Sequence, residues 1–408
     1  LSMLKQITQS KKLNDVCYDI RGPVLEKANA LESEGHKILK LNIGNPAPFG
    51  FEASDEIISN VRNHLAEAQG YIDSQGLLEA RQAIMEECLA QGISDVNVDD
   101  IFVGNGVSEL ISMSMQALLN DGDEVLIPSP DYPLWTASVT LSGGKPVHYR
   151  CDENADWYPS ISDIKAKLSD KTRAIIIINP NNPTGAVYDK QILIELIEVA
   201  RTNNLIIFSD EIYGKITFDN TPFIPVAALS EDVFTVSFSG LSKTYKLAGF
   251  RCGWMVMSGP KHLAINYIEG LNILSNMRLC SNVLAQFAVE PALRNDSLSQ
   301  QLTLPNGRLE SQRNITWNAL NNIPGISCVK PGGAFYLFPK LDPKFYNIDN
   351  DEDLILDVLS SEKILLVQGS AFNIPDNHHF RIVFLPSADQ LSDALVRIGA
   401  VLEKYHSF

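Results

Sequence analysis

The sequence lacks the residue patterns that mark metal-binding and disulfide-bonded proteins. Its six cysteines are scattered, with no Cys-x-x-Cys pair, and it has only seven histidines. His378 and His379 are adjacent, and neighbouring side chains on a strand or helix point in different directions. We therefore expect no metal site, and we expect reduced thiols in a chain of this length.

Long apolar runs and positive charge are also scarce. No run reaches the ~18–20 residues of a membrane helix, and residues 174–178 have the length of a strand. The first 16 residues contain no apolar segment like the core of a signal peptide. The 33 Lys and Arg are outnumbered by 49 Asp and Glu, whereas nucleic-acid binding needs clustered cations. We expect a cytoplasmic protein with neither a membrane nor a nucleic-acid partner.

The middle of the chain has the alternating pattern of an α/β protein. Short apolar runs predict strands, and between them lie amphipathic stretches such as residues 190–203, with apolar residues at helical spacing. This order indicates a mostly parallel sheet sandwiched by helices. The predicted strands are residues 101–106, 123–130, 174–179, 205–210, 233–240 and 253–258.

The pattern changes after about residue 292. A polar stretch leads into a long helical segment, several short strands and a closing helix over residues 388–405. We interpret this part as a smaller α+β domain that a helix near residues 23–34 completes. The predicted division is an N-terminal segment over 1–45 that supplies a lid and part of the small domain, a large domain over 46–300, and a small domain over 301–408.

Unusual residues follow four of the predicted strands. Gly106-Val107-Ser108 come after the first strand, NPNNPTG (179–185) begins where the 174–179 strand ends, Asp210 ends a strand, and Lys243 follows residues 233–240. In an open parallel sheet, ligands bind beyond the carboxyl ends of the strands. This convergence predicts one site more strongly than any single motif does.

Each piece also has a common structural explanation. Lys243 fits a solvated surface charge, the usual role of a lysine in a loop, or a Schiff-base lysine, to which its small neighbours would give access to a planar ring. Arg251 fits a phosphate contact or a surface ion pair. Asp210 fits a partner of a protonated pyridine nitrogen or a helix N-cap.

The remaining motifs are ambiguous in the same way. GNGVSEL (104–110) resembles a phosphate-binding turn before a helix, yet it also reads as an ordinary helix start. Tyr132 fits a ring-stacking residue or a core aromatic. NPNNPTG is a rigid turn that fixes Asn182 in one direction. A turn alone does not explain why the Asp-ended strand and the lysine loop follow in this order.

The order of these motifs resembles the class I/II aminotransferases, pyridoxal 5′-phosphate (PLP) enzymes of fold type I, over essentially the whole chain. The resemblance implies that Lys243 forms the Schiff base with PLP and that Asp210 faces the pyridine nitrogen. It also implies that Asn182 and Tyr213 bind the phenolic oxygen and that Tyr132 stacks on the ring. The implied phosphate ligands are Gly106, Val107, Ser108, Ser242, Arg251 and Tyr71, the last from the neighbouring subunit of a homodimer.

The resemblance implies substrate contacts as well. Arg381 in HHFRIVFL would bind the substrate α-carboxylate, together with Asn182 and the backbone of Gly44. Tyr18 and Arg21 in YDIRGPV would belong to a lid over the site. If the substrate is glutamate, a second arginine should bind its side-chain carboxylate. We prefer Arg21 to Arg278 for this contact, because a mobile lid can close on glutamate and readjust for alanine.

The branch of the family is indicated by longer strings. YDIRGPV, KLNIGNPAPFGF, PDYPLWTA and INPNNPTGAVY together resemble bacterial aminotransferases that act on alanine and glutamate. Lys246, Cys252 and Gly240 depart from the usual lysine signature of the family.

The alternative functions are an aminotransferase with an aromatic or branched donor, a PLP lyase, and a regulator on the same fold. A regulator should carry a basic DNA-binding extension, which this acidic chain lacks.

Overall fold

The computed structural model describes residues 5–18 and 22–408. Eight strands form the central sheet, in the order β2-β9-β8-β7-β6-β3-β4-β5. Pairing is parallel among β4, β3, β6, β7 and β8 and antiparallel at β5 and β9. The bounds are β2 Ile101–Gly104, β3 Glu124–Ser129, β4 Lys145–Asp152, β5 Tyr158–Pro159, β6 Thr172–Ile178, β7 Ile206–Asp210, β8 Thr235–Gly240 and β9 Gly253–Ser258.

Helices cover both faces of this sheet, which explains its uninterrupted apolar strands. Side chains along a strand alternate between the two faces. In β6, Ala174, Ile176 and Ile178 join the core formed with helices α4, α5 and α8, whereas Ile175 and Ile177 join the core formed with α7. The helices of this part are α2 Asp55–Asn63, α3 Leu78–Ala90, α4 Gly106–Leu118, α5 Pro133–Leu141, α6 Ile161–Lys167, α7 Lys190–Thr202, α8 Ile265–Met277, α9 Val283–Gln286, α10 Val289–Asn295 and α11 Leu298–Gln301.

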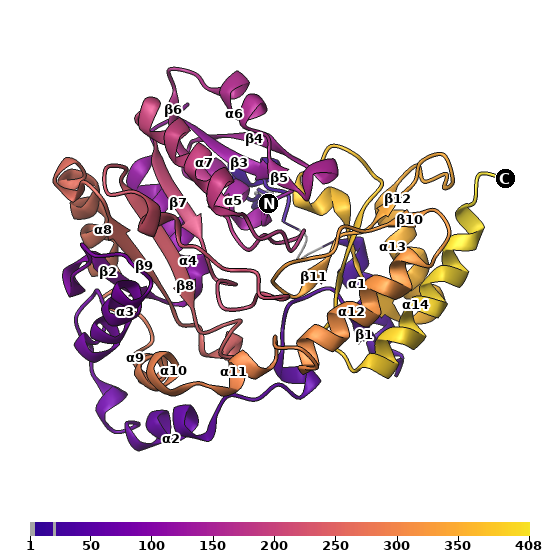
Figure 1. The fold of residues 1–408 in the computed structure, drawn as a ribbon, viewed down its shortest axis with the longest axis horizontal. Coiled ribbons are helices and arrows are strands. Elements are labelled where there is room, and N and C mark those ends of the chain that lie inside the picture. The colour runs from indigo at the N-terminus through magenta and orange to yellow at the C-terminus, as the bar shows by residue number, and fades with distance from the viewer. Residues whose placement is uncertain (1–4, 19–21) are drawn as a thin grey trace.

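A second lobe lies beside the sheet (Figure 1). It contains short strands packed by α12 Arg308–Asn321, α13 Asp351–Glu362 and α14 Ala388–Leu402. The N-terminal helix α1 Pro23–Ser33 packs on α13, and β1 Leu39–Lys40 pairs with β13 Ile364–Leu365. The other short strands are β10 Ile326–Ser327, β11 Tyr336–Leu337, β12 Lys340–Leu341, β14 Val367–Gln368 and β15 Phe380–Val383.

The predicted α/β fold with a mostly parallel sheet is confirmed. All six predicted strands of the sheet are present, within about two residues at each end. The strand β4 was not predicted, because Lys145, His148 and Arg150 interrupt its apolar pattern. The predicted closing helix ends as α14 at Leu402, and a 3-10 turn continues to Tyr405. The domain boundaries at residues 45/46 and 300/301 stay a prediction.

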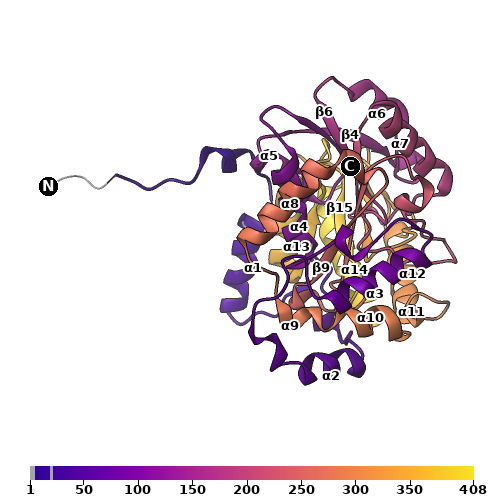
Figure 2. The same ribbon diagram turned by 90° about the vertical axis from the view of Figure 1, so that its left-hand side faces the viewer.

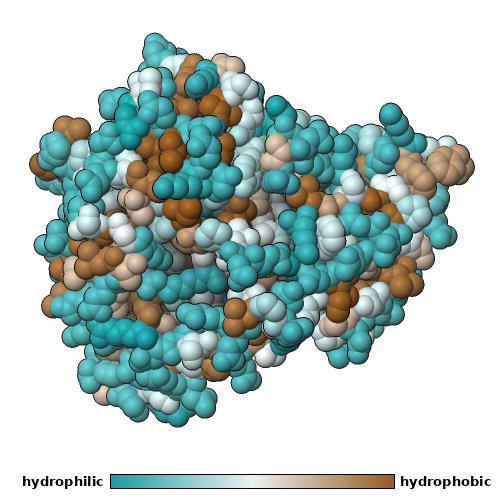
Figure 3. Space-filling view, viewed as in Figure 1, coloured by the Kyte–Doolittle hydropathy of each residue, from teal (hydrophilic) through white to brown (hydrophobic). Residues whose placement is uncertain are grey.

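The surface in Figure 3 is mainly hydrophilic, with separate apolar patches. Within the described residues, no helix is both long and apolar enough to span a membrane, and no group of three or more potential metal ligands occurs. The first described residues extend away from the body of the molecule (Figure 2), and the chain returns to it at the 3-10 helix Lys11–Asp15, which contacts α5.

A buried histidine joins the second lobe to the sheet. The two ring nitrogens of His379 lie 2.8 Å from Glu153 Oε2 and 2.9 Å from Asp376 Oδ1. Burial disfavours the charged ring, but the hydrogen bonds that His379 donates to Asp376 and Glu153 outweigh it and raise the pKa of His379. Because both nitrogens face carboxylates, which only accept when ionised, this arrangement favours the imidazolium form of the ring.

This contact predicts a pH-dependent stability. The pKa of His379 is higher in the folded than in the unfolded protein, where it is about 6.5. The contribution of this contact to the free energy of unfolding is therefore complete below a pH of about 6.5. It is lost as the pH rises through the raised pKa of the folded state. We expect His379→Gln to lower Tm most at about pH 6 and least at about pH 9. The exposed His262→Gln is the matched control, and a deficit that grows with pH would contradict this account.

Candidate active site

A cavity of about 370 Å³ lies at the carboxyl ends of β6, β7 and β8, where the sheet meets the second lobe. Asn182, Asp210 and Lys243 line it from the loops and strand ends of the sheet, and Arg381 lines it from β15. The parallel pairing of these strands explains why residues from separate motifs meet here.

Lys243 and Asp210 both line this cavity. Lys243 Nζ donates to the carbonyl of Gly44 at 2.8 Å. Asp210 is 3% exposed and accepts hydrogen bonds from Trp135 Nε1 at 3.1 Å and the backbone N–H of Ile212 at 3.4 Å. Burial raises the pKa of Asp210, while the indole, the amide and nearby Lys243 act in the opposite direction. Among the described residues, no cation forms an ion pair with this carboxylate.

The turn between β2 and α4 presents an anion-binding surface. Gly106 has φ +79°, and a Cβ there would overlap the guanidinium of Arg251. Arg251 Nη2 in turn donates to Ser108 Oγ at 3.0 Å. The first N–H groups of α4 have no partner within the helix, and they carry its positive dipole end. A cation, a hydroxyl and helix N–H groups therefore converge, as a phosphate site requires.

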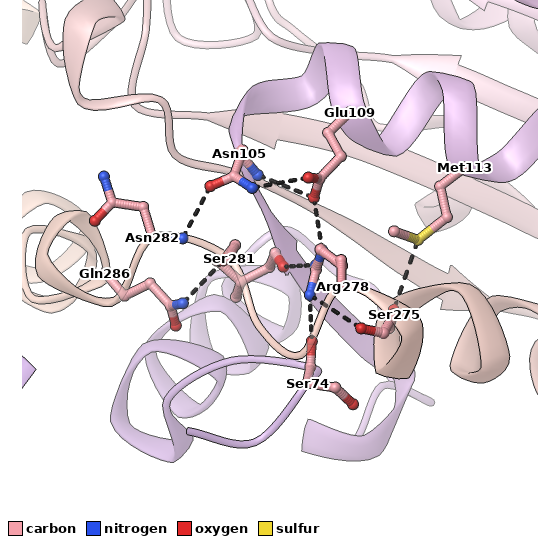
Figure 4. A network of polar contacts seen from close by, with 10 residues as sticks. Ser74, Asn105, Glu109, Met113, Ser275, Arg278, Ser281, Asn282 and Gln286 are labelled. Atoms are coloured by element: carbon pink, nitrogen blue, oxygen red, sulfur yellow. Dashed lines mark hydrogen bonds and ion pairs between the residues drawn. The ribbon is translucent and has the colours of Figure 1, made fainter. Parts of the chain in front are cut away.

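Arg278 supports this turn from behind (Figure 4). Its Nε donates to Glu109 Oε1 at 3.0 Å, and Glu109 Oε2 accepts from Asn105 Nδ2 at 2.8 Å. Its two Nη atoms bind the carbonyls of Ser74 and Val103, at 3.1 and 3.0 Å. The guanidinium is thus engaged in structural contacts, and Arg278 does not line the cavity.

Arg381 stands at the opposite end of the cavity. Its Nη1 donates to Asn182 Oδ1 at 2.8 Å, and its Nη2 contacts the carbonyl of Asn42. The guanidinium lies between two rings, with Cζ 4.3 Å from the Tyr336 centroid and 4.8 Å from that of Phe372. Its buried Nε has no hydrogen-bond partner among the described residues. A carboxylate is the ligand that such a preorganised cation suits.

Most of the predicted site residues come together here. Those lining the cavity are Tyr18, Gly44, Val107, Ser108, Tyr132, Asn182, Asp210, Tyr213, Ser242, Lys243, Arg251 and Arg381. Gly106 packs behind Arg251, and the hydroxyls of Tyr18 and Tyr132 lie 3.3 Å apart. Tyr71 is 79% exposed and does not line this cavity. Arg21 lies outside the described residues. Gly240, Lys246 and Cys252, which depart from the usual signature, are not part of the cavity lining.

Three aromatic residues of the site were not predicted. Trp135 binds Asp210, while Tyr336 and Phe372 enclose Arg381. Trp135 follows Tyr132 by about one helical turn, and this spacing could have identified it as a site residue from the sequence. Tyr336 and Phe372 lie in apolar segments whose pattern is equally typical of core residues.

Comparisons with known proteins agree with this geometry. The family pattern "Aminotransferase class I and II" matches residues 36–398. The chain belongs to the class I and II aminotransferases. The chain is 57% identical over 403 residues to the Escherichia coli "Glutamate-pyruvate aminotransferase AlaA", covering 99% of this chain and 100% of that one. It is 54% identical over 402 residues to the Mycobacterium tuberculosis "Alanine aminotransferase", covering 98% and 94%. A crystal structure of an aminotransferase from Escherichia coli superposes with a TM-score of 0.97, at 57% identity and 99% and 100% coverage.

The predictions of an aminotransferase and of PLP as its cofactor are thereby confirmed. The residues present fit this cofactor. The anion-binding turn suits its phosphate, Lys243 suits its aldehyde, and the buried Asp210 carboxylate, which has no cationic partner among the described residues, suits a protonated pyridine nitrogen. The individual roles stay predictions.

The role of Lys243 has a spectroscopic test. Lys243→Ala should abolish the visible absorbance of lysine-linked PLP but retain some noncovalently bound PLP, because the contacts to phosphate and ring survive. We expect turnover to fall by roughly three orders of magnitude or more, because one residue serves as nucleophile and proton carrier. The control is Lys145→Ala, whose side chain is 70% exposed. An unchanged visible spectrum in Lys243→Ala would exclude this assignment.

Proposed function

We propose that the chain transfers amino groups between L-alanine and 2-oxoglutarate, giving pyruvate and L-glutamate, by a ping-pong mechanism. The supporting observation is the full-length similarity to relatives named for these substrates, at 57% and 54% identity. The cavity fits small anionic substrates, because the Arg381 guanidinium lines it next to Asn182.

The chemistry divides between the two ends of the cavity. When bound, PLP supplies an electron sink for the negative charge that develops at the substrate Cα. We propose that Asp210 keeps the positive charge on the ring nitrogen and that Lys243 Nζ carries the proton to and from Cα. Arg381 and Asn182 hold the α-carboxylate, and so fix the orientation of the Cα–H bond toward Lys243. Tyr213 and Asn182 bind the phenolic oxygen, and Tyr132 stacks on the ring.

The phosphate end holds the cofactor in place. Val107, Ser108, Ser242 and Arg251 line this end of the cavity, and Gly106 lets the backbone approach closely. The backbone of Gly44 and the Tyr18 hydroxyl lie on the substrate side. Tyr18 reaches the site from the N-terminal segment, which supports its proposed place in a lid together with Arg21.

We further propose a homodimer. Exposed apolar side chains gather along and beside α8, including Leu263, Ile265 and Met277 at 76%, 66% and 76% exposure. Such a group is typical of a protein–protein interface. The extended segment before the 3-10 helix Lys11–Asp15 fits an arm that lies on a second copy (Figure 2). Tyr71, which is exposed and does not line its own cavity, would then reach the phosphate of the neighbouring subunit. A cytoplasmic location stays a prediction.

The reaction is tested by single turnover. L-Alanine alone should release about one pyruvate per active site and then stop, because a ping-pong enzyme needs a second keto acid to continue. Adding 2-oxoglutarate should restart turnover. A panel with aromatic and branched donors tests the alternative specificities, and a higher kcat/KM for one of them would refute the alanine assignment. Sustained release of ammonia or CO₂ without a keto acid would instead indicate a lyase.

The distal carboxylate of glutamate gives a second test. Arg278 is held by Glu109 and two carbonyls, so we expect Arg278→Ala to lower Tm and to affect alanine and glutamate alike. Arg21→Ala should lose at least about tenfold, roughly 1.4 kcal/mol, more kcat/KM on glutamate than on alanine. Discrimination by Arg278→Ala alone would reverse this choice.

A further inference from the structure

Tyr336 lies where the two halves of the site meet. It is 2% exposed and belongs to β11, which pairs antiparallel with β15 in the register Tyr336–Val383 and Leu337–Ile382. Arg381 is two residues from Val383, on the same face of the pair, so the register places the tyrosine ring beside the guanidinium. The face of the ring is covered by Arg381 at 4.3 Å.

The hydroxyl of Tyr336 is directed toward Tyr213, which also lines the cavity. Its one hydrogen-bond partner among the described residues is the hydroxyl of Tyr213, which is itself 2% exposed. The two rings meet edge to face, with centroids 5.7 Å apart. Gly44 leaves room for the Tyr336 hydroxyl, because a Cβ at Gly44 would overlap it. The same glycine accepts the hydrogen bond from Lys243 Nζ.

The count of hydrogens limits how this pair can act. Each hydroxyl has one hydrogen to donate and can accept through its lone pairs. If Tyr336 donates to Tyr213, the Tyr213 hydrogen stays free for an acceptor in the cavity, whereas the reverse arrangement leaves Tyr213 no hydrogen to donate. A cation over the face of the Tyr336 ring draws electron density toward itself, which favours Tyr336 as the donor. Burial first, and then Tyr336, raises the pKa of Tyr213, so its hydroxyl stays protonated.

We propose that Tyr336 is a positioning residue that couples binding of the substrate carboxylate at Arg381 to the hydrogen bond that Tyr213 makes with the cofactor. By donating to Tyr213, Tyr336 strengthens Tyr213 as a donor, because hydrogen bonds in a chain polarise one another. A carboxylate on Arg381 neutralises the cation over the Tyr336 ring and so weakens this donation. The inference rests on the proposed roles of Arg381 and Tyr213, but it does not depend on which amino acid is the natural donor.

The test is a spectrophotometric pH titration of lysine-linked PLP, with and without propionate, which is alanine without its amino group. In the wild type we expect saturating propionate to move the midpoint pH of this spectral titration to a higher value. Tyr336→Phe keeps the ring and removes the hydroxyl. Without ligand, its midpoint should lie about 0.5–1 pH unit above that of the wild type, the equivalent of one neutral hydrogen bond. Propionate should then move it by less than half of the wild-type shift.

Two further variants separate coupling from general disturbance. Tyr213→Phe should raise the ligand-free midpoint at least as much as Tyr336→Phe does. Tyr188→Phe removes another fully buried hydroxyl, outside the cavity, and should leave both midpoints and the propionate shift unchanged. Tyr336→Phe with wild-type midpoints in both conditions would overturn the proposal. If propionate shifts the midpoint of Tyr336→Phe by as much as it shifts that of the wild type, the proposed coupling is also overturned. Failure of L-alanine to release pyruvate would refute only the proposed substrate, since these titrations need no turnover.

Discussion

Parallel pairing of β3, β6, β7 and β8 is the constraint on which the site depends. It brings the carboxyl ends of strands that are far apart in sequence to a single edge, and the chain must leave that edge through loops. NPNNPTG, Asp210 and the Lys243 loop are three such exits. The antiparallel β9 closes the arrangement, because it pairs with both β8 and β2 and so brings Arg251, just before β9, beside the turn at Gly106.

Buried charge then determines how the two lobes meet. Asp210 and Arg381 are 3% and 8% exposed, so each needs compensation. Protein groups provide part of it: Trp135 for the acid, and Asn182, Asn42 and two rings for the base. Two groups stay uncompensated among the described residues. The unpartnered Nε of Arg381 matches a carboxylate substrate, and the Asp210 carboxylate, which has no cationic partner, matches a protonated ring. The groups left unsatisfied by the protein thus correspond to the groups that the reaction brings.

Sequence reasoning succeeded where one local pattern determined the outcome. The strands of the sheet are buried on both faces, so their apolar runs could be recognised without knowing which strands lie beside them. Once the strands were recognised, the polar residues at their carboxyl ends could be predicted as site residues. It failed for β4, where Lys145, His148 and Arg150 occupy partly exposed positions. It also missed Tyr336, because only the register of β11 against β15 shows that this ring faces Arg381 rather than the core alone. Arg278 illustrates the same limit: nothing local in NMRLCSN indicates that its guanidinium is held by Glu109 and backbone carbonyls.

The pair Asp210–Glu211 shows how the end of a strand separates two adjacent acids. Asp210 lines the cavity, while the carboxylate of Glu211 is directed elsewhere, where it accepts hydrogen bonds from Ser209 Oγ and the backbone N–H of Val226. Burial raises the pKa of Glu211 to about 7, and the neighbouring Asp210 acts in the same direction. The raised pKa favours the neutral form of Glu211, which limits the negative charge beside Asp210. Asp210 can then remain the carboxylate that a protonated ring nitrogen needs, without two full negative charges buried side by side.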